Sequence, residues 1–224
     1  MDTRDTTETE AAAPETTARG AGGRQRIGDL LALAAARAVP VVRGIGDERL
    51  AAPTPCAEYD VRDLLNHLFQ VVEQFRSLAA KGDADFSSTP DRVAEDPGWR
   101  ERFAKETDAL VAAWSAPGAD EGTAGAMGLP AATVGGMALL DLTVHAWDLA
   151  RATGQEYPVD AGLLPVVEAL RATVAELAPM ARSRGVFGAP VPVAADAPVL
   201  DRLLAETGRD PLWEGAGLGR AGRG

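Results

Sequence analysis

Hydrophobic side chains recur at helical spacing through most of the chain. Leucine, valine and alanine return every three or four residues, the period that places them on one face of a helix. The stretches with this period are 27–44, 61–80, 99–114, 137–154, 160–184 and 198–207. Hydrophobic residues make up 46% of the chain and aromatic residues only 5%, so the expected core is helical and contains few rings. The pattern predicts an all-α protein.

Particular residues mark where these helices begin and end. Asp60 is a good N-cap for the helix that starts at Val61, and Gly154 is a plausible residue to follow the end of 137–154. Pro40 should kink or end the first helix. The segments between the helices lack the helical period. Residues 81–97 are expected to form a polar loop, 116–130 a long connection and 186–198 an extended, irregular segment.

The two ends of the chain differ from the rest. Residues 1–25 are rich in Thr, Glu, Ala, Gly and Arg and contain almost no large apolar side chain, which predicts a disordered tail. Residues 214–224 are expected to form a second disordered tail. The segment 26–213 is therefore interpreted as one helical domain, with no internal repeat.

Charge and cysteine content exclude several classes of protein. The formal net charge of −11 disfavours binding to nucleic acid or to an anionic membrane surface. No apolar run approaches the ~18 residues of a membrane span, and the N-terminus lacks the pattern of a secretory signal. Cys56 is the only cysteine, so no disulfide within the chain can form. We therefore expect a cytoplasmic protein.

The stretch 137–154 carries a polar stripe. Asp141, His145 and Asp148 stand four and then three residues apart, so a helix places them on one face. Bulky apolar residues flank this stripe, which indicates that it faces inward. A carboxylate and an imidazole at this spacing inside a bundle are a natural pair of metal ligands. The alternative is an exposed helix face on which Asp148 forms an ion pair with Arg151.

The second histidine, His67, lies beside the apolar stripe of the helix 61–80. Asp63 precedes it by one turn on the same flank, where its carboxylate could orient the imidazole of a metal ligand. The alternative interpretation is a histidine at the edge of the core that is hydrogen-bonded to a neighbouring carboxylate. The sequence alone favours this second interpretation.

Three segments carry a resemblance to a known family: TPCAEYDVRDLLNHL (54–68), DLTVHAWDLARATG (141–154) and DRLLAETGRDPLW (201–213). Together they resemble the DinB-like metal-binding superfamily. The resemblance is stronger to the branch that contains the metal-binding N-terminal domain of mycothiol-dependent maleylpyruvate isomerase. It spans about residues 27–213 and implies an up-down-down-up four-helix bundle with an additional C-terminal helical segment.

The resemblance also implies a ligand set. In the family, a histidine of the second helix and an acid-x-x-x-His pair of a later helix hold the metal. These positions correspond to His67, Asp141 and His145, and the chain has only two histidines. Asp63 and Asp148 are candidates for residues that support the ligands. The isomerase has Glu where this chain has Asp141, and residues 158–224 look too short to reproduce its C-terminal domain. The resemblance therefore supports the ligand set of this chain better than it supports the isomerase reaction.

Two imidazoles and one carboxylate leave positions on a divalent ion for water or substrate, and Zn, Ni, Fe and Mn all accept such ligands. The leading hypothesis is a metal-dependent thiol transferase or thiol-assisted isomerase that acts on a small electrophile with a low-molecular-weight thiol such as mycothiol. Two alternatives stay open. One is a non-catalytic metal-binding or stress protein, and the other is a metal-dependent tailoring enzyme or hydrolase that uses no thiol.

The remaining expectations concern the role of Cys56 and the partners of the chain. By residue type Cys56 is a candidate fourth ligand, but some three turns of chain separate it from His67, so we interpret it as a packing residue before the helix. The expected partner is a small-molecule substrate, with no nucleic acid and no membrane. The chain is expected to be a monomer or a homodimer.

Overall fold

The computed structural model describes residues 25–126 and 128–215. Helices dominate this part of the chain, so the all-α prediction is confirmed. The helices are α1 (Ile27–Arg43), the short 3₁₀ helix η1 (Asp47–Arg49), α2 (Val61–Ala79), α3 (Arg92–Glu95), α4 (Trp99–Ser115), α5 (Ala131–Thr153), α6 (Leu164–Ser183) and α7 (Val199–Glu206). Two short antiparallel strands, β1 (Thr123–Ala124) and β2 (Leu129–Pro130), precede α5.

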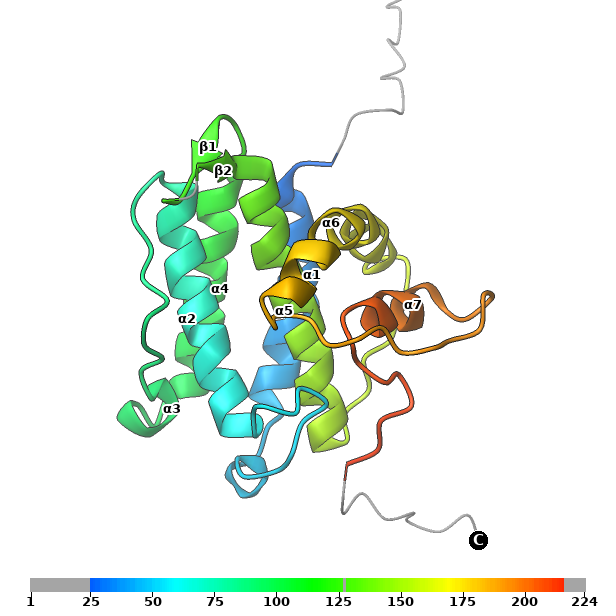
Figure 1. Ribbon diagram of the computed structural model, residues 1–224. Helices are drawn as coiled ribbons and strands as arrows, with labels where there is room; N and C mark the ends of the chain where they lie inside the picture. Colours follow the sequence, from blue (N-terminus) through cyan, green and yellow to red (C-terminus); the bar gives the residue numbers. More distant parts are fainter. Residues whose placement is uncertain (1–24, 127, 216–224) are drawn as a thin grey trace, which may run out of the picture.

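Four long helices form the bundle. Helix α1 packs against α4 and α5, and α2 packs against the same two helices. Figure 1 shows that the chain between α2 and α4 returns along the length of the bundle, so these two helices run in the same direction. Helices α1 and α5 run in the opposite direction (Figure 1). This is the up-down-down-up bundle that the resemblance implied.

Helix α2 supplies much of the core. The Asp60 carboxylate accepts a hydrogen bond from the Asp63 amide and caps the helix as predicted. The indole of Trp114 on α4 donates to the Phe75 carbonyl and ties the two helices together. All six residues of the predicted apolar stripe are buried: Val61, Leu64, Leu65, Leu68, Val72 and Phe75.

Gly135 lies at a close approach of three helices. A Cβ atom on Gly135 of α5 would lie 2.7 Å from Ile27 Cγ2 on α1 and 2.9 Å from a ring carbon of Trp114 on α4. Both distances are shorter than van der Waals contact, so a side chain there would force the three helices apart. At the other end of α5, Gly154 adopts the left-handed conformation (φ 73°) that was expected at this helix terminus.

Several boundaries differ from the sequence pattern. Helix α5 begins at Ala131, six residues before the predicted start, because small residues of the run AATVGG give little polar contrast. Helix α1 continues past Pro40 to Arg43. The predicted loop 81–97 contains α3, and the predicted connection 116–130 contains β1 and β2. These elements are too short to produce a period.

The C-terminal segment adds a layer beside the bundle. Helix α6 packs against α5 and α1, and α7 packs against α6 (Figure 1). The connection between α6 and α7 is irregular, as predicted, and its Val191 amide donates to the Ala205 carbonyl. Among the described helices, none combines the length and the apolar character needed to cross a bilayer. Most of the two predicted tails, residues 1–24 and 216–224, lies outside the described residues.

Candidate metal centre

Two neighbouring helices bring the three predicted ligands together. His67 comes from α2, and Asp141 and His145 come from α5. One potential ligand atom of each residue lies within 4.8 Å of the other two. The two imidazole rings meet edge to face, with centroids 5.0 Å apart and an interplanar angle of 89°. The structure thus places in one cluster the residues that the sequence selected, and metal binding by them stays a prediction.

The polar stripe of α5 faces inward. His145 is 7% exposed and Asp148 is fully buried, while Leu142 and Leu149 fill the core beside them. The interpretation of an exposed helix face is therefore wrong. Because most of the α5 surface is covered, its polar side chains must find partners inside the protein.

Asp148 orients the ring of His145. Its Oδ2 atom lies 2.9 Å from His145 Nδ1. We infer that Nδ1 carries the proton and leaves Nε2 free for a ligand bond, the arrangement by which carboxylates support metal-bound histidines. The alternative pairing with Arg151 does not occur, because the Arg151 guanidinium donates to the Trp213 carbonyl at 2.5 Å.

Arg209 is a functional candidate that the sequence analysis missed. It follows α7, and its Nη2 atom donates to Asp148 Oδ2 at 3.2 Å, while Nη1 donates to the Thr207 carbonyl. The residue is 9% exposed, so its charge lies inside the protein. It belongs to the segment 201–213 that carried part of the resemblance, but a single arginine in a turn has no periodic pattern that reveals its contact.

Asp63 does not reach His67. It lies on the exposed side of α2, and among the described residues no hydrogen bond joins its carboxylate to the imidazole. Tyr59 contacts the ring instead: the two rings stack with centroids 5.5 Å apart and an interplanar angle of 17°. The residue that supports His67 therefore comes from the loop before α2.

The cluster opens into a cavity of about 320 Å³, which we call the site cavity. Helices α2 and α5 and the turn before α2 form one wall. The residues that follow α6 and α7 form the other wall. Cys56 lines it, so its chain separation from His67 does not keep it away from the centre. The lining residues are Cys56, Glu58, Tyr59, His67, Leu140, Asp141, Val144, His145, Gly185, Val186, Phe187, Thr207 and Arg209.

Burial sets the protonation of the groups in the site cavity. Burial, together with the nearby His145 and Arg209, lowers the pKa of His67 to about 4, so the ring is neutral at pH 7. Burial raises the pKa of Asp141, and His145 and Arg209 oppose this effect. Burial also raises the pKa of Cys56, and the positive charge of Arg209 opposes this effect.

This donor set suits a divalent transition metal. A neutral imidazole offers a nitrogen lone pair, and a carboxylate supplies an oxygen ligand with negative charge. His67, Asp141 and His145 provide three such donors, and the Asp148 contact fixes the orientation of one of them. Three protein ligands are typical of sites that keep a position for substrate or water.

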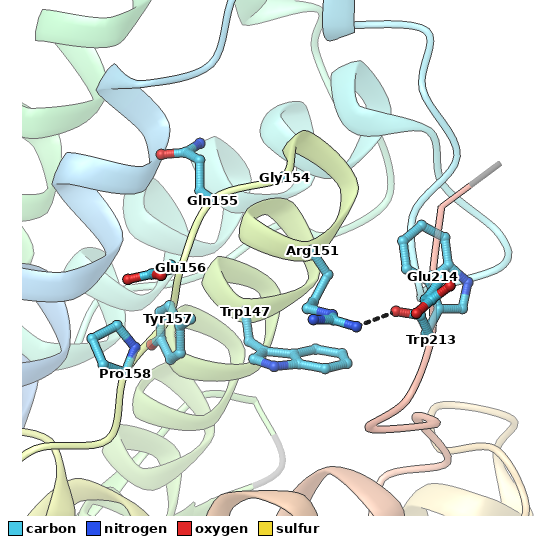
Figure 2. Close-up of a pocket in the computed structure, with 9 residues that line it drawn as sticks. All are labelled: Trp147, Arg151, Gly154, Gln155, Glu156, Tyr157, Pro158, Trp213 and Glu214. Atoms are coloured by element: carbon cyan, nitrogen blue, oxygen red, sulfur yellow. Dashed lines mark hydrogen bonds between the residues drawn. The ribbon is translucent and has the colours of Figure 1, made fainter. Parts of the chain in front are cut away.

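A larger cavity, of about 600 Å³, lies at the C-terminal end of α5 and contains none of the three predicted ligands. We call it the tryptophan cavity. Figure 2 shows the Trp147 ring between Tyr157 and Trp213, with the Arg151 side chain reaching toward the Trp213 backbone. Its lining residues are Trp147, Arg151, Gly154, Gln155, Glu156, Tyr157, Pro158, Trp213 and Glu214.

Comparison with known proteins finds a matching family and similar mycobacterial proteins. Residues 31–150 match the family described as the mycothiol maleylpyruvate isomerase N-terminal domain. Proteins described as uncharacterized from two strains of Mycobacterium tuberculosis are 33% identical over 170 residues, which cover 72% of this chain and 86% of theirs. No solved structure matches the chain significantly.

Proposed function

Because the chain belongs to the mycothiol maleylpyruvate isomerase N-terminal domain family, we propose that it is a metal-dependent thiol transferase or thiol-assisted isomerase. In this proposal His67, Asp141 and His145 hold one divalent ion. A low-molecular-weight thiol of the mycothiol type binds in the site cavity and attacks a small electrophile. The observation that carries the proposal is the convergence of the three donors within 4.8 Å at the wall of that cavity.

Charge supports a thiol as the ligand of the open position. Two neutral imidazoles and one carboxylate leave a divalent ion with a net charge of about +1, which favours an anionic ligand such as a thiolate. When bound, the ion supplies Lewis acidity that lowers the pKa of the thiol. Arg209 also lines the cavity, where its guanidinium, although paired with Asp148, offers a donor to an anionic group on the thiol or the electrophile.

The volume of the site cavity limits the substrate. About 320 Å³ lies at the lower end of the range for small-molecule pockets. His145 is held by Asp148, and the rings of Tyr59 and Phe187 line the cavity, so the reacting groups meet in a partly enclosed space. These features favour a small electrophile over a macromolecular substrate.

Metal analysis of variants tests the first half of the proposal. We expect purified wild-type protein to hold about one divalent ion per chain, and His67→Ala and His145→Ala to hold almost none. Asp63→Ala is the matched control, because it removes an exposed carboxylate of α2 and should leave the metal content unchanged. Equal metal content in the wild type and both histidine variants would contradict the site assignment.

Thiol consumption tests the second half. Protein loaded with Zn²⁺, Ni²⁺, Fe²⁺ or Mn²⁺ is incubated with mycothiol and a small electrophile such as an unsaturated dicarboxylic acid or an aryl halide. We expect product formation that requires both metal and thiol. Metal binding without any thiol-dependent product would leave a metal-binding protein and overturn the catalytic part of the proposal. Turnover of substrate without thiol would point to a hydrolase or a tailoring enzyme.

A further inference from the structure

Cys56 is held at the edge of the centre by a tight turn. The Thr54 hydroxyl lies 2.9 Å from the carbonyl oxygens of both Cys56 and Tyr59, and it accepts a hydrogen bond from the Cys56 amide at 3.1 Å. These contacts fix the backbone of Cys56. Its thiol lines the site cavity together with the three predicted ligands.

The thiol lies next to one of those ligands. Cys56 Sγ, a ring nitrogen of His145 and a carboxylate oxygen of Asp148 all lie within 4.8 Å of one another. Asp148 is fully buried, and its Oδ1 atom has no hydrogen-bond partner among the described residues. A second group of potential donors therefore overlaps the first and shares His145 with it.

The Cys56 thiol is near His145, but it does not belong to the group formed by His67, Asp141 and His145, so a shared ion requires it to move closer. Sulfur and nitrogen ligands bind zinc at about 2.3 and 2.0 Å, so two such ligands of a tetrahedral ion lie about 3.5 Å apart. The bound on the Sγ to His145 distance is 4.8 Å. Since the backbone of Cys56 is fixed, a rotation of its side chain is the movement that would close the remaining gap.

We propose that Cys56 is a fourth, displaceable metal ligand, which joins His67, Asp141 and His145 in the resting protein and gives way to the substrate thiol. This inference rests on the proposed function, because it needs an ion at the centre. On binding, the S–H bond of Cys56 breaks, its proton passes to water, and a sulfur–metal bond forms without oxidation or reduction. When a substrate thiolate binds, Cys56 takes up a proton and leaves.

The ligand exchange gives the cysteine a protective role. A resting centre with four protein ligands excludes water and other anions from the ion, as in structural zinc sites. Only a ligand that competes with a thiolate, such as another thiol, then opens the position. Cys56 thereby selects thiols over oxygen ligands.

Cobalt spectroscopy tests the proposal directly. Metal-free protein, kept reduced with a phosphine so that no other thiol is present, is titrated with Co²⁺. We expect a near-ultraviolet sulfur-to-cobalt charge-transfer band in the wild type that is absent in Cys56→Ser and Cys56→Ala. Both variants should still bind Co²⁺, with an affinity that is at least about tenfold weaker. Circular dichroism checks that each variant is folded.

The outcomes separate this inference from the proposed function. If wild-type protein binds Co²⁺ through His67 and His145 but shows no charge-transfer band, Cys56 is not a ligand, and the three-ligand centre stands. If the wild type binds no Co²⁺, both proposals fall. A second readout is the rate at which iodoacetamide alkylates Cys56, which bound metal should slow and which Asp63→Ala should not change.

Discussion

The two cavities at α5 differ in the chemistry that they enclose. The tryptophan cavity is the larger, about 600 Å³ against about 320 Å³, and aromatic rings form much of its wall (Figure 2). Its arginine is engaged by the backbone of Trp213. The site cavity is lined by two histidines, two carboxylic acids and a cysteine, and its arginine is hydrogen-bonded to the carboxylate that orients His145.

The volume of a cavity and the number of potential metal donors in it are therefore unrelated in this molecule. A metal needs donors within a few ångströms of one point, and only the smaller cavity has them among the described residues. The larger cavity is lined by residues of the same helix but contains none of the three predicted ligands. The two cavities thus provide controls for each other.

Removing the carboxylate ligand should have the largest effect. Asp141→Asn replaces a charged oxygen donor by a neutral amide, and we expect the affinity for Zn²⁺ to fall by more than about 100-fold. Isothermal titration calorimetry measures the change. Glu214→Gln makes the same chemical change on the wall of the tryptophan cavity and should leave the affinity unaltered. Equal losses in the two variants would contradict the assignment of Asp141.

Removing the support of His145 should have a smaller effect. Asp148→Asn keeps the shape of the side chain but loses the charge that holds the Nδ1 proton and faces Arg209. We expect metal affinity to fall by about 10–100-fold, as for other residues that orient metal-bound histidines. Glu156→Gln is the control in the tryptophan cavity. Unchanged affinity in Asp148→Asn would show that the contact does not orient the ligand.

Truncation in the tryptophan cavity should affect stability alone. Trp213→Ala removes a half-buried indole, and we expect the free energy of unfolding to fall by about 1–2 kcal/mol in urea titrations. The affinity for metal should change by less than about twofold, because the variant leaves the ligands and their supports in place. A large loss of metal binding would mean that the two cavities are coupled.

The smallest effect is expected at high pH. Burial raises the pKa of Tyr157, in the tryptophan cavity, above its ordinary value of 10. A raised folded-state pKa gives a stabilising contribution that is complete below pH 10 and is lost as the pH rises beyond it. We expect Tyr157→Phe to reduce this alkaline loss of stability in urea titrations between pH 9 and about 11. Burial also raises the pKa of Tyr59, so Tyr59→Phe should remove a separate part of the loss and leave the Tyr157 contribution in place. Identical profiles in wild type and Tyr157→Phe would refute this assignment.

The fold was predictable where apolar contrast was strong. Helix α2 followed from its apolar stripe and from Asp60 as its cap. The start of α5 was not predicted, because Ala and Gly satisfy neither an apolar nor a polar pattern. Short elements such as α3 depend on contacts that no local period records.

The candidate site was predictable to the same limited extent. Helical spacing selected Asp141 and His145, whereas His67 became a candidate ligand only through the resemblance. The reach of Cys56 was underestimated because its distance was counted along the chain, whereas the turn held by Thr54 places it on the wall of the site cavity near His145. Arg209 contacts a residue 61 positions earlier in the sequence, and no local pattern encodes such a contact.

The site cavity is built from two segments of the chain, one inside and one outside the family match. Residues 31–150 include all three predicted ligands, but Phe187, Thr207 and Arg209 lie beyond that segment. In the proposed function, the ligands of the ion and part of the wall that selects the reactant are therefore encoded in separate segments of the chain. Exchanging the segment after residue 150 would then change which molecules enter the site while the three donors stay the same.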